Sequence, residues 1–293
     1  MLTEAIQIYR SRRFRECEDR AFMLTAVGIP NEMTRETAGY VLWVDPQQVQ
    51  QAREHLELYQ RERLPPPVPL PPLPLRPDAW IGCVIYALVL IAVAWAVGRG
   101  FGRLDAFDVG ELDAAHVQAG QWWRAWTALT LHVDAEHLIA NLGAGIWFGY
   151  IAGRLLGPGI AWLLTVEGAA LANLLEALAA APEHRSVGAS TAVFTSLGLL
   201  TVYTWLERHR LQQRWALRYG PLVAGVVLLG WFGTEGENTD VVAHLAGFIC
   251  GGLAAVLIAR EPLRQLRARL PQRLAGALAV GSIVIAWICG LAS

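Results

Sequence analysis

Seven long stretches with few or no charged side chains follow one another after residue 78, and they constrain the fold more than any other feature. They cover residues 79–98, 137–153, 160–181, 186–206, 219–234, 241–259 and 274–293. A helix of about 20 residues crosses the roughly 30 Å hydrocarbon core of a bilayer, and shorter helices are tolerated inside a bundle. The sequence therefore predicts an all-α polytopic membrane helical bundle with seven spans.

The charged residues are concentrated at the N-terminal end. Residues 1–78 hold 21 of the 49 Arg, Asp and Glu residues, and the chain contains no Lys. We therefore expect residues 1–63 to form a small soluble α+β domain. The formal net charge of −1 argues against a nucleic-acid partner, because nucleic-acid binders carry a basic surface.

The soluble domain is expected to have the order β-α-β-β-α. Residue periodicity predicts strands over 4–10, 31–35 and 40–44, and helices over 14–27 and 46–63. Asp45 is the expected N-cap of the second helix, with proline following it at the first helical position. With its Gly28-Ile29-Pro30 turn, this order resembles a small domain of bacterial signalling-type proteins. A folded appendage without chemistry is the first interpretation, and a regulatory or protein-binding module is the second.

Residues 64–78 form a proline-rich linker. Proline at this density forces an extended polyproline II spacer. The linker separates the soluble domain from the membrane part, and a protein partner that binds proline-rich segments could also use it.

Arginine is distributed unevenly between the predicted loops. With a cytoplasmic N-terminus, the inner loops carry 10 Arg and the outer loops carry 4. Cytoplasmic loops are enriched in basic residues, so we expect the N-terminus inside and the C-terminus outside. Exclusive use of Arg as the cation is typical of a GC-rich bacterial genome, which makes the bacterial inner membrane the expected location.

Polar side chains recur near the start of three predicted spans. His137 and Asn141 share one face of the second span, Ser190 opens the fourth, and His244 lies in the sixth. In the expected orientation all three spans start at the outer surface, so the four polar groups lie at a common depth. Because polar groups inside a membrane are costly, this arrangement indicates a site.

The residue types suit nucleophilic catalysis. Ser190 supplies a hydroxyl that becomes nucleophilic when a base takes its proton, and His244 can be that base. His137 and Asn141 can donate hydrogen bonds to a developing oxyanion. The backbone N–H of Ser190, at the start of a helix, can do the same.

Small residues surround these positions. Gly247 and Gly251 form a GxxxG pair that lets the sixth span approach the fourth closely. Gly188, two residues before the serine, has no side chain and leaves space on the other side of Ser190. Phe194 lies one turn after the serine and is expected to stack on the ring of His244.

These motifs, in this order and on these spans, resemble the rhomboid family of intramembrane serine proteases. The matching pieces lie within residues 79–260 and are Trp123-Arg124, His132-x4-His137-x3-Asn141, Gly188-x-Ser190, and Ala243-His244-x-Ala246-Gly247 with Gly251. The resemblance implies a six-helix protease domain that cleaves transmembrane segments of other membrane proteins. Its catalytic dyad would be Ser190 and His244, without an acid.

The resemblance also implies roles for the surrounding residues. His137, Asn141 and the serine N–H would form the oxyanion hole, with His132 in support. Trp123 and Arg124 would structure the first loop, and Trp231 and Phe232 would lie at a lateral substrate gate.

Two features depart from the family pattern, and one adds to it. Thr191 stands where the family usually has Gly, and its β-branch narrows the space near the nucleophile. Residues 152–156, at the inner end of the second span, lack an acidic residue that the family often has. Residues 261–293 add a basic loop and a seventh helix to the six-helix core.

Two alternatives remain open from the sequence. The first is a metal site built from His132, His137 and His244, although the chain lacks HExxH spacing and an acidic ligand at that depth. The second is a catalytically inactive rhomboid relative that binds membrane clients, against which the intact Ser190 and His244 argue.

Several other polar residues have no assigned role. They are Glu167, Asn173 and Glu176 in the third span, and the loop histidines His116, His184 and His209, which are expected to be solvated. The four cysteines have no CxxC spacing, which indicates neither a zinc site nor a disulfide framework. We expect no cofactor.

Overall fold

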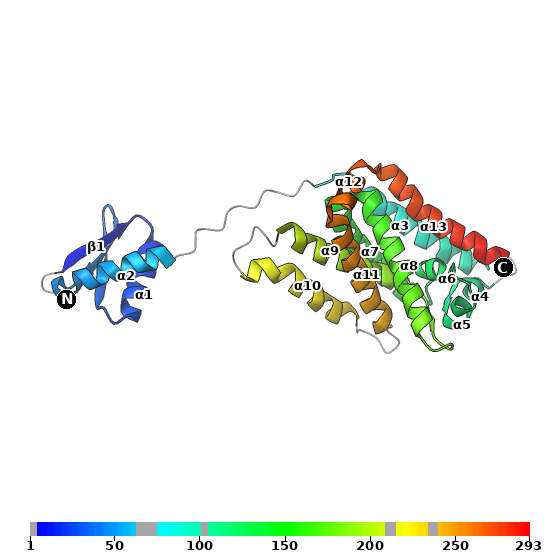
Figure 1. The fold of residues 1–293 in the computed structure, drawn as a ribbon, viewed down its shortest axis with the longest axis horizontal. Coiled ribbons are helices and arrows are strands. Elements are labelled where there is room, and N and C mark those ends of the chain that lie inside the picture. The colour runs from blue at the N-terminus through cyan, green and yellow to red at the C-terminus, as the bar shows by residue number, and fades with distance from the viewer. Residues whose placement is uncertain (1–4, 63–74, 101–104, 209–214, 234–239) are drawn as a thin grey trace. The chain divides into compact units, whose positions relative to one another are not determined.

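The computed structural model describes residues 5–62, 75–100, 105–208, 215–233 and 240–293. The chain divides into two compact units, Met1–Val68 and Pro69–Ser293, each with its own hydrophobic core (Figure 1). Most of the proline-rich linker and His209 lie outside the described residues.

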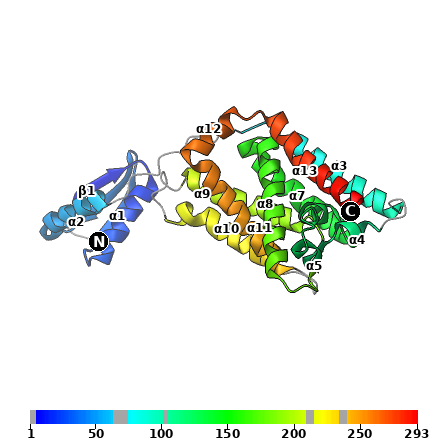
Figure 2. The ribbon, with the colours of Figure 1, turned by 45° about the vertical axis from the view of Figure 1, so that its right-hand side comes forward.

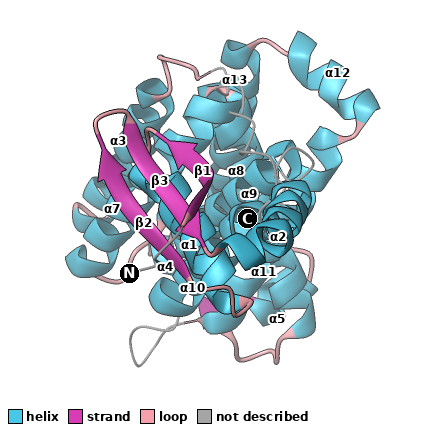
Figure 3. Ribbon diagram, turned by 90° about the vertical axis from the view of Figure 1, so that its left-hand side faces the viewer, coloured by secondary structure: helices cyan, strands magenta, loops and turns pink. Residues whose placement is uncertain are grey.

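The first unit is a three-stranded antiparallel sheet with two helices (Figure 3). Its elements are β1 Ile6–Ser11, α1 Phe14–Ala26, β2 Asn31–Glu36, β3 Gly39–Val44, a 3-10 turn Pro46–Gln48 and α2 Val49–Glu62. The central strand β3 pairs with both neighbours and contributes buried Val41, Leu42 and Val44. The predicted element order is confirmed, as is the Asp45 cap, whose carboxylate accepts a hydrogen bond from the Gln47 N–H at 2.9 Å.

The second unit contains one long helix at each of the seven predicted stretches. These helices are α3 Trp80–Gly98, α7 Ala135–Leu156, α8 Pro158–Ala179, α9 Ser190–Arg208, α10 Trp215–Gly233, α11 Val241–Ala259 and α13 Gln272–Ala292. Among the described residues, five of them (α3, α8, α10, α11 and α13) are long and apolar enough to cross a membrane. The all-α polytopic membrane fold is therefore confirmed.

Helix α9 packs against α7, α8, α10 and α11, which are labelled in Figure 2. All of its residues from 191 to 199 are buried. The buried set includes polar Thr191, Thr195 and Ser196, and the hydroxyls of Thr195 and Ser196 are satisfied locally. Thr195 donates to the Thr191 carbonyl at 2.7 Å, and Ser196 bonds the hydroxyl of Thr165 on α8 at 2.9 Å. Internal hydrogen bonds of this kind let the polar side chains of α9 be buried inside the bundle.

Glycines allow α9 and α11 to approach backbone to backbone. A Cβ at Gly251 would collide with the carbonyl of Thr195, and a Cβ at Gly198 would collide with the carbonyl of Phe248. At Gly247 a Cβ would lie 2.6 Å from the carbonyl oxygen of Thr191. The predicted close approach at the GxxxG pair is thus confirmed, with Gly198 as a third contributor from the opposite helix.

Short elements fill the segment between α3 and α7. They are α4 Ala106–Gly110, β4 Leu112–Asp113, α5 Ala114–Gln118, α6 Arg124–Thr127 and a 3-10 turn Ala128–Thr130. Strand β4 pairs with β5 Arg185–Ser186, which ties this segment to the loop that precedes α9. Burial by itself raises the pKa of Asp113, but hydrogen bonds from His116 and the charge of Arg185 bring it below its ordinary value.

The last two helices are α12 Glu261–Arg269 and α13, which packs along α8. At its start, the Gln272 amide accepts from the Ile160 N–H at 3.1 Å and donates to the Leu156 carbonyl at 3.2 Å, so it caps the turn between α7 and α8. Toward its end, Trp287 donates to the hydroxyl of Thr130 at 3.1 Å. Contacts at both ends integrate the added helix into the bundle.

The α9–α11 contact predicts which glycine substitutions destabilise the bundle. Gly251→Ala places a methyl group against backbone that has no room to move, and we expect a cost of about 1–3 kcal/mol and a lower Tm of the detergent-solubilised chain. Gly281→Ala on α13 is the matched control, because no atom lies within 4 Å of its Cβ position, and it should leave the Tm unchanged or raise it. Equal Tm values for the two variants would contradict close α9–α11 packing.

Candidate active site

The serine lies at the first residue of α9 and is half-buried. Gly188 precedes it with φ of +131°, a backbone conformation that side chains rarely adopt. The turn is held from both sides, because Gly188 N–H donates to the Ala128 carbonyl at 3.0 Å and Ala189 N–H donates to Nε2 of His132 at 3.4 Å. Ser190 therefore starts its helix from a fixed loop.

His244 lies on the first turns of α11 and is 6% exposed. Its ring centroid is 4.3 Å from that of Phe194, at an interplanar angle of 34°. The contact expected between these two rings is present. Because Phe194 is one turn after Ser190, the imidazole lies beside the first turn of α9.

One ring nitrogen of His244 is already engaged. Its Nδ1 is 3.0 Å from the carbonyl oxygen of Gly233, the last residue of α10. A carbonyl can only accept a hydrogen bond, so Nδ1 is the nitrogen that carries the proton in neutral His244. Nε2 is then the nitrogen with a free lone pair.

The side chains of His137 and Asn141, both on α7, lie beside Gly188 of the serine turn. A Cβ built on Gly188 would lie 2.6 Å from Cε1 of His137 and 3.6 Å from Nδ2 of Asn141. The Asn141 side chain is buried, and its Nδ2 has no hydrogen-bond partner in the described part of the chain. A buried amide donor beside the serine loop is available for an acceptor that is not part of the protein.

His132 supports the serine loop as a neutral acceptor. It lies outside the membrane helices, between the 3-10 turn and α7, and its ring is 5.1 Å from that of His137. Burial, followed by the neighbouring His137, lowers the pKa of His132 to about 4. Its Nε2 can thus accept from the Ala189 N–H at neutral pH.

The β-branch of Thr191 is directed toward α11. Its side chain is buried and its methyl group faces Gly247, where a Cβ would approach it to 3.2 Å. The glycine on α11 provides the space that the larger residue on α9 takes.

The first-loop pair lies apart from this cluster. Arg124 is 4% exposed and donates to the carbonyls of Glu111 and Asp108 and to the side chain of Gln121, at 2.9, 2.6 and 2.6 Å. The Trp123 ring faces Gly290 of α13. Arg124 thus connects elements of the first loop, and Trp123 connects that loop to α13.

Trp231 and Phe232 end α10 with exposed side chains, at 64% and 50%. They directly precede Gly233, which bonds His244. The residues expected at a substrate gate thus adjoin the site through the backbone of one helix end.

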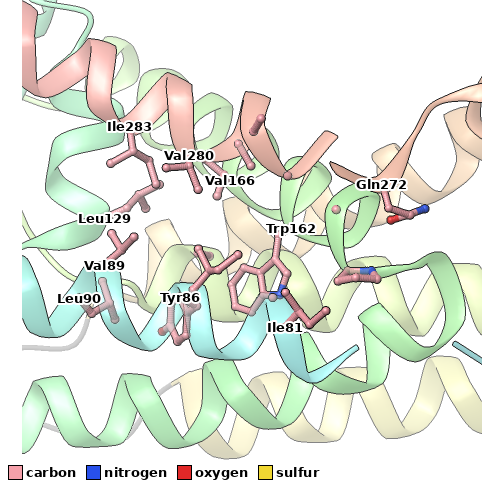
Figure 4. Close-up of a pocket in the computed structure, with 18 of the residues that line it drawn as sticks. Ile81, Tyr86, Val89, Leu90, Leu129, Trp162, Val166, Gln272, Val280 and Ile283 are labelled. Carbon is pink, nitrogen blue, oxygen red and sulfur yellow. The ribbon is translucent and has the colours of Figure 1, made fainter. Parts of the chain in front are cut away.

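An apolar cavity of about 460 Å³ lies between α3, α8 and α13 (Figure 4). Tyr86 and Trp162 stack on its wall with ring centroids 4.7 Å apart. Ser190 and His244 do not line it, but Ala189 and Ala192 do, so the cavity adjoins the serine turn.

Two parts of the arrangement were not predicted from the sequence. The Gly233 carbonyl is a backbone group at a helix end, and no residue pattern marks it. His184 was expected to be solvated, but its side chain is only 28% exposed and lies against Glu176 and Asp240. Within the described ranges, these three form the one group of three or more metal-type ligands, and His132, His137 and His244 do not form another.

Comparison with known proteins supports the interpretation of the helical unit. A family model described as the rhomboid domain matches residues 119–261. The chain is 31% identical over 149 residues to Rhomboid protease GluP of Bacillus subtilis, covering 51% of this chain and 28% of that protein. It is 30% identical over 147 residues to Rhomboid-like protease 1 of Toxoplasma gondii, covering half of each.

A third relative is Rhomboid protease GlpG of Salmonella choleraesuis, which is 29% identical over 135 residues, covering 44% of this chain and 46% of that protein. The chain thus spans less than two thirds of the length of these relatives. The matched region contains the serine turn, α11 and the polar residues of α7. The sequence match and the helical bundle together identify residues 119–261 as a rhomboid domain.

Proposed function

We propose that this chain is an intramembrane serine endopeptidase with Ser190 as nucleophile and His244 as general base. The observation that carries the proposal is the 4.3 Å contact between Phe194 and His244, which brings the imidazole to the turn of α9 that begins with Ser190. The relatives named as rhomboid proteases support the same activity.

The reaction uses the free nitrogen of His244. Nε2 takes the proton of the Ser190 hydroxyl as its oxygen attacks the carbonyl carbon of the scissile peptide bond. The protonated imidazole then gives that proton to the leaving amine, and an acyl-enzyme remains on Ser190. Water, deprotonated by the same nitrogen, hydrolyses the acyl-enzyme and regenerates the serine.

The Gly233 carbonyl has part of the role that the carboxylate has in a Ser-His-Asp triad. It holds Nδ1–H at 3.0 Å, which fixes the tautomer and the ring orientation of His244. Being uncharged, it stabilises the imidazolium less than a carboxylate would.

The developing oxyanion is stabilised by groups already near the serine. The unpaired amide of Asn141, the ring of His137 and the backbone N–H of Ser190 are its donors. The start of α9 adds the positive end of the helix dipole.

The substrate class follows from the surroundings of the site. We propose transmembrane segments of other membrane proteins, cleaved near the outer surface of a bacterial inner membrane that the chain crosses seven times with its N-terminus inside. Substrates enter beside Trp231 and Phe232 and unwind locally, because a helix keeps its carbonyls in internal hydrogen bonds.

The first unit and the proline-rich linker are proposed to bind a protein partner or to act as an appendage and spacer. The alternative for the whole chain, an inactive rhomboid-like protein that binds clients, has the same fold but would not need an activated serine. Covalent labelling of Ser190 by a fluorophosphonate probe separates the two. A folded chain that is not labelled would favour the inactive alternative.

Removing either member of the dyad should abolish proteolysis. We expect Ser190→Ala and His244→Ala to reduce cleavage of a co-expressed single-span substrate by at least about 10³-fold, as in other serine proteases. Immunoblotting of the substrate fragments measures this, with membrane levels of each variant as the control. Continued cleavage in either variant would defeat the proposal.

The oxyanion role of Asn141 predicts an effect on kcat rather than on binding. Loss of one oxyanion donor typically costs about 10²–10³-fold in kcat, so we expect that loss for Asn141→Ala, with KM little changed. Asn173→Ala is the matched control, because it removes another buried amide, which donates to the Ala125 carbonyl at 2.9 Å. It should lower the Tm and leave the kcat of the folded chain close to that of the wild type, and a similar kcat loss in both variants would indicate a structural role.

A further inference from the structure

A second polar cluster lies at the ends of α8 and α11, away from Ser190. Glu176 lies in the last turn of α8, His184 lies in the loop before β5, and Asp240 is the N-cap of α11. One ligand atom from each residue lies within 4.8 Å of the other two. We propose that this cluster binds a divalent transition-metal ion, with Zn²⁺ as its typical occupant.

The polar atoms of the cluster have no partners except one another. Both carboxylate oxygens of Glu176, Nε2 of His184 and Oδ2 of Asp240 are buried and bond to no described residue outside the cluster. Glu176 is 5% exposed. A buried carboxylate without a partner is strongly unfavourable, so the cluster requires a positively charged ligand or a shared proton.

The spacing of these atoms fits a tetrahedral cation. Nε2 of His184 is 3.6 Å from Oε1 of Glu176 and 3.4 Å from Oδ2 of Asp240. Ligand bonds of 2.0–2.2 Å place tetrahedral ligand atoms about 3.3–3.6 Å apart. The two observed separations therefore lie within the range expected for ligands on a common ion.

The donor set selects the class of metal. Two carboxylates balance the charge of a divalent ion, and one neutral imidazole favours zinc and its neighbours over Ca²⁺ and Mg²⁺, which prefer oxygen alone. Three protein ligands leave a fourth position for water.

Each ligand is held in place by a contact that leaves its metal-facing atom free. Oδ1 of Asp240 accepts the Ala243 N–H at 3.0 Å, so Oδ2 is the atom directed into the cluster. The backbone of His184 is bonded at both its N–H and its carbonyl, to Ala181 and Ala114 at 3.0 Å each. Gln118 donates to the carbonyls of Ala177 and Ala180 and fixes the end of α8 next to Glu176.

The ion would connect the two segments that lead into the proposed dyad. His184 is six residues before Ser190, and Asp240 is four residues before His244. A bound ion thus fixes the start of α9 relative to the start of α11. This inference goes beyond the proposed protease activity, and its test does not depend on that activity.

Metal binding is measured on the full-length Ser190→Ala variant in detergent micelles, stripped with a chelator and titrated with Zn²⁺ by calorimetry. We expect one saturable Zn²⁺ site per chain and a Tm that rises with Zn²⁺ concentration, because a ligand that binds the folded state stabilises it. Ca²⁺ and Mg²⁺ at the same concentrations should produce neither effect. A folded chain without saturable Zn²⁺ binding, or one that prefers Ca²⁺, overturns the proposal.

Substitutions identify the site. Glu176→Gln, His184→Asn and Asp240→Asn, each in the Ser190→Ala chain, should weaken Zn²⁺ binding at least 10-fold. Glu167→Gln is the matched control on the same helix, because its carboxylate accepts from the Trp126 indole instead. His116→Asn removes the other described histidine–carboxylate pair, with Asp113. Both controls should bind Zn²⁺ as the parent chain does, and equal affinity of Glu176→Gln and Glu167→Gln would overturn the assignment.

Discussion

The contact between the backbones of α9 and α11 is the constraint on which the rest of the helical unit depends. Gly198, Gly247 and Gly251 leave no side chain between the two helices, and the carbonyls of Thr191, Thr195 and Phe248 occupy the space. In lipid the hydrophobic effect contributes little to helix association, so van der Waals contact between closely approaching helices has to stabilise the pair. The first turns of α9 and α11 are thereby brought together, and with them the serine and the imidazole.

In the helical unit, several buried polar groups are satisfied by backbone groups rather than by opposite charges. Arg124 donates to two carbonyls, His132 accepts from a backbone N–H, and His244 uses the carbonyl of Gly233. Neutral partners avoid the desolvation of a second charge, which is the main cost of a buried ion pair. The cluster of Glu176, His184 and Asp240 differs from these residues, because four of its buried polar atoms have no hydrogen-bond partner outside the cluster.

Sequence patterns were sufficient to predict the helices, because an apolar stretch of about 20 residues in a membrane can form few structures other than a helix. They also predicted the ring contact of Phe194 with His244, since residues one turn apart share a helix face. They did not predict the Gly233 carbonyl, a backbone group whose position depends on where α10 ends. They also did not predict the partners of His184, because a loop histidine becomes buried only through tertiary packing of β4 against β5.

The hydrogen bond between Gly233 and His244 links the position of helix α10 to the position of the proton on the imidazole ring. Helix α10 has the most exposed surface of the five apolar helices and ends at that carbonyl. A 3.0 Å hydrogen bond is lost when its atoms separate by about 1 Å more. An outward tilt of α10 large enough to pass a peptide would therefore release Nδ1 of His244, and the ring proton could then reside on either nitrogen. If substrates enter beside α10, as proposed, the position of this one helix end controls both the width of that entrance and the ring nitrogen of His244 that carries the proton.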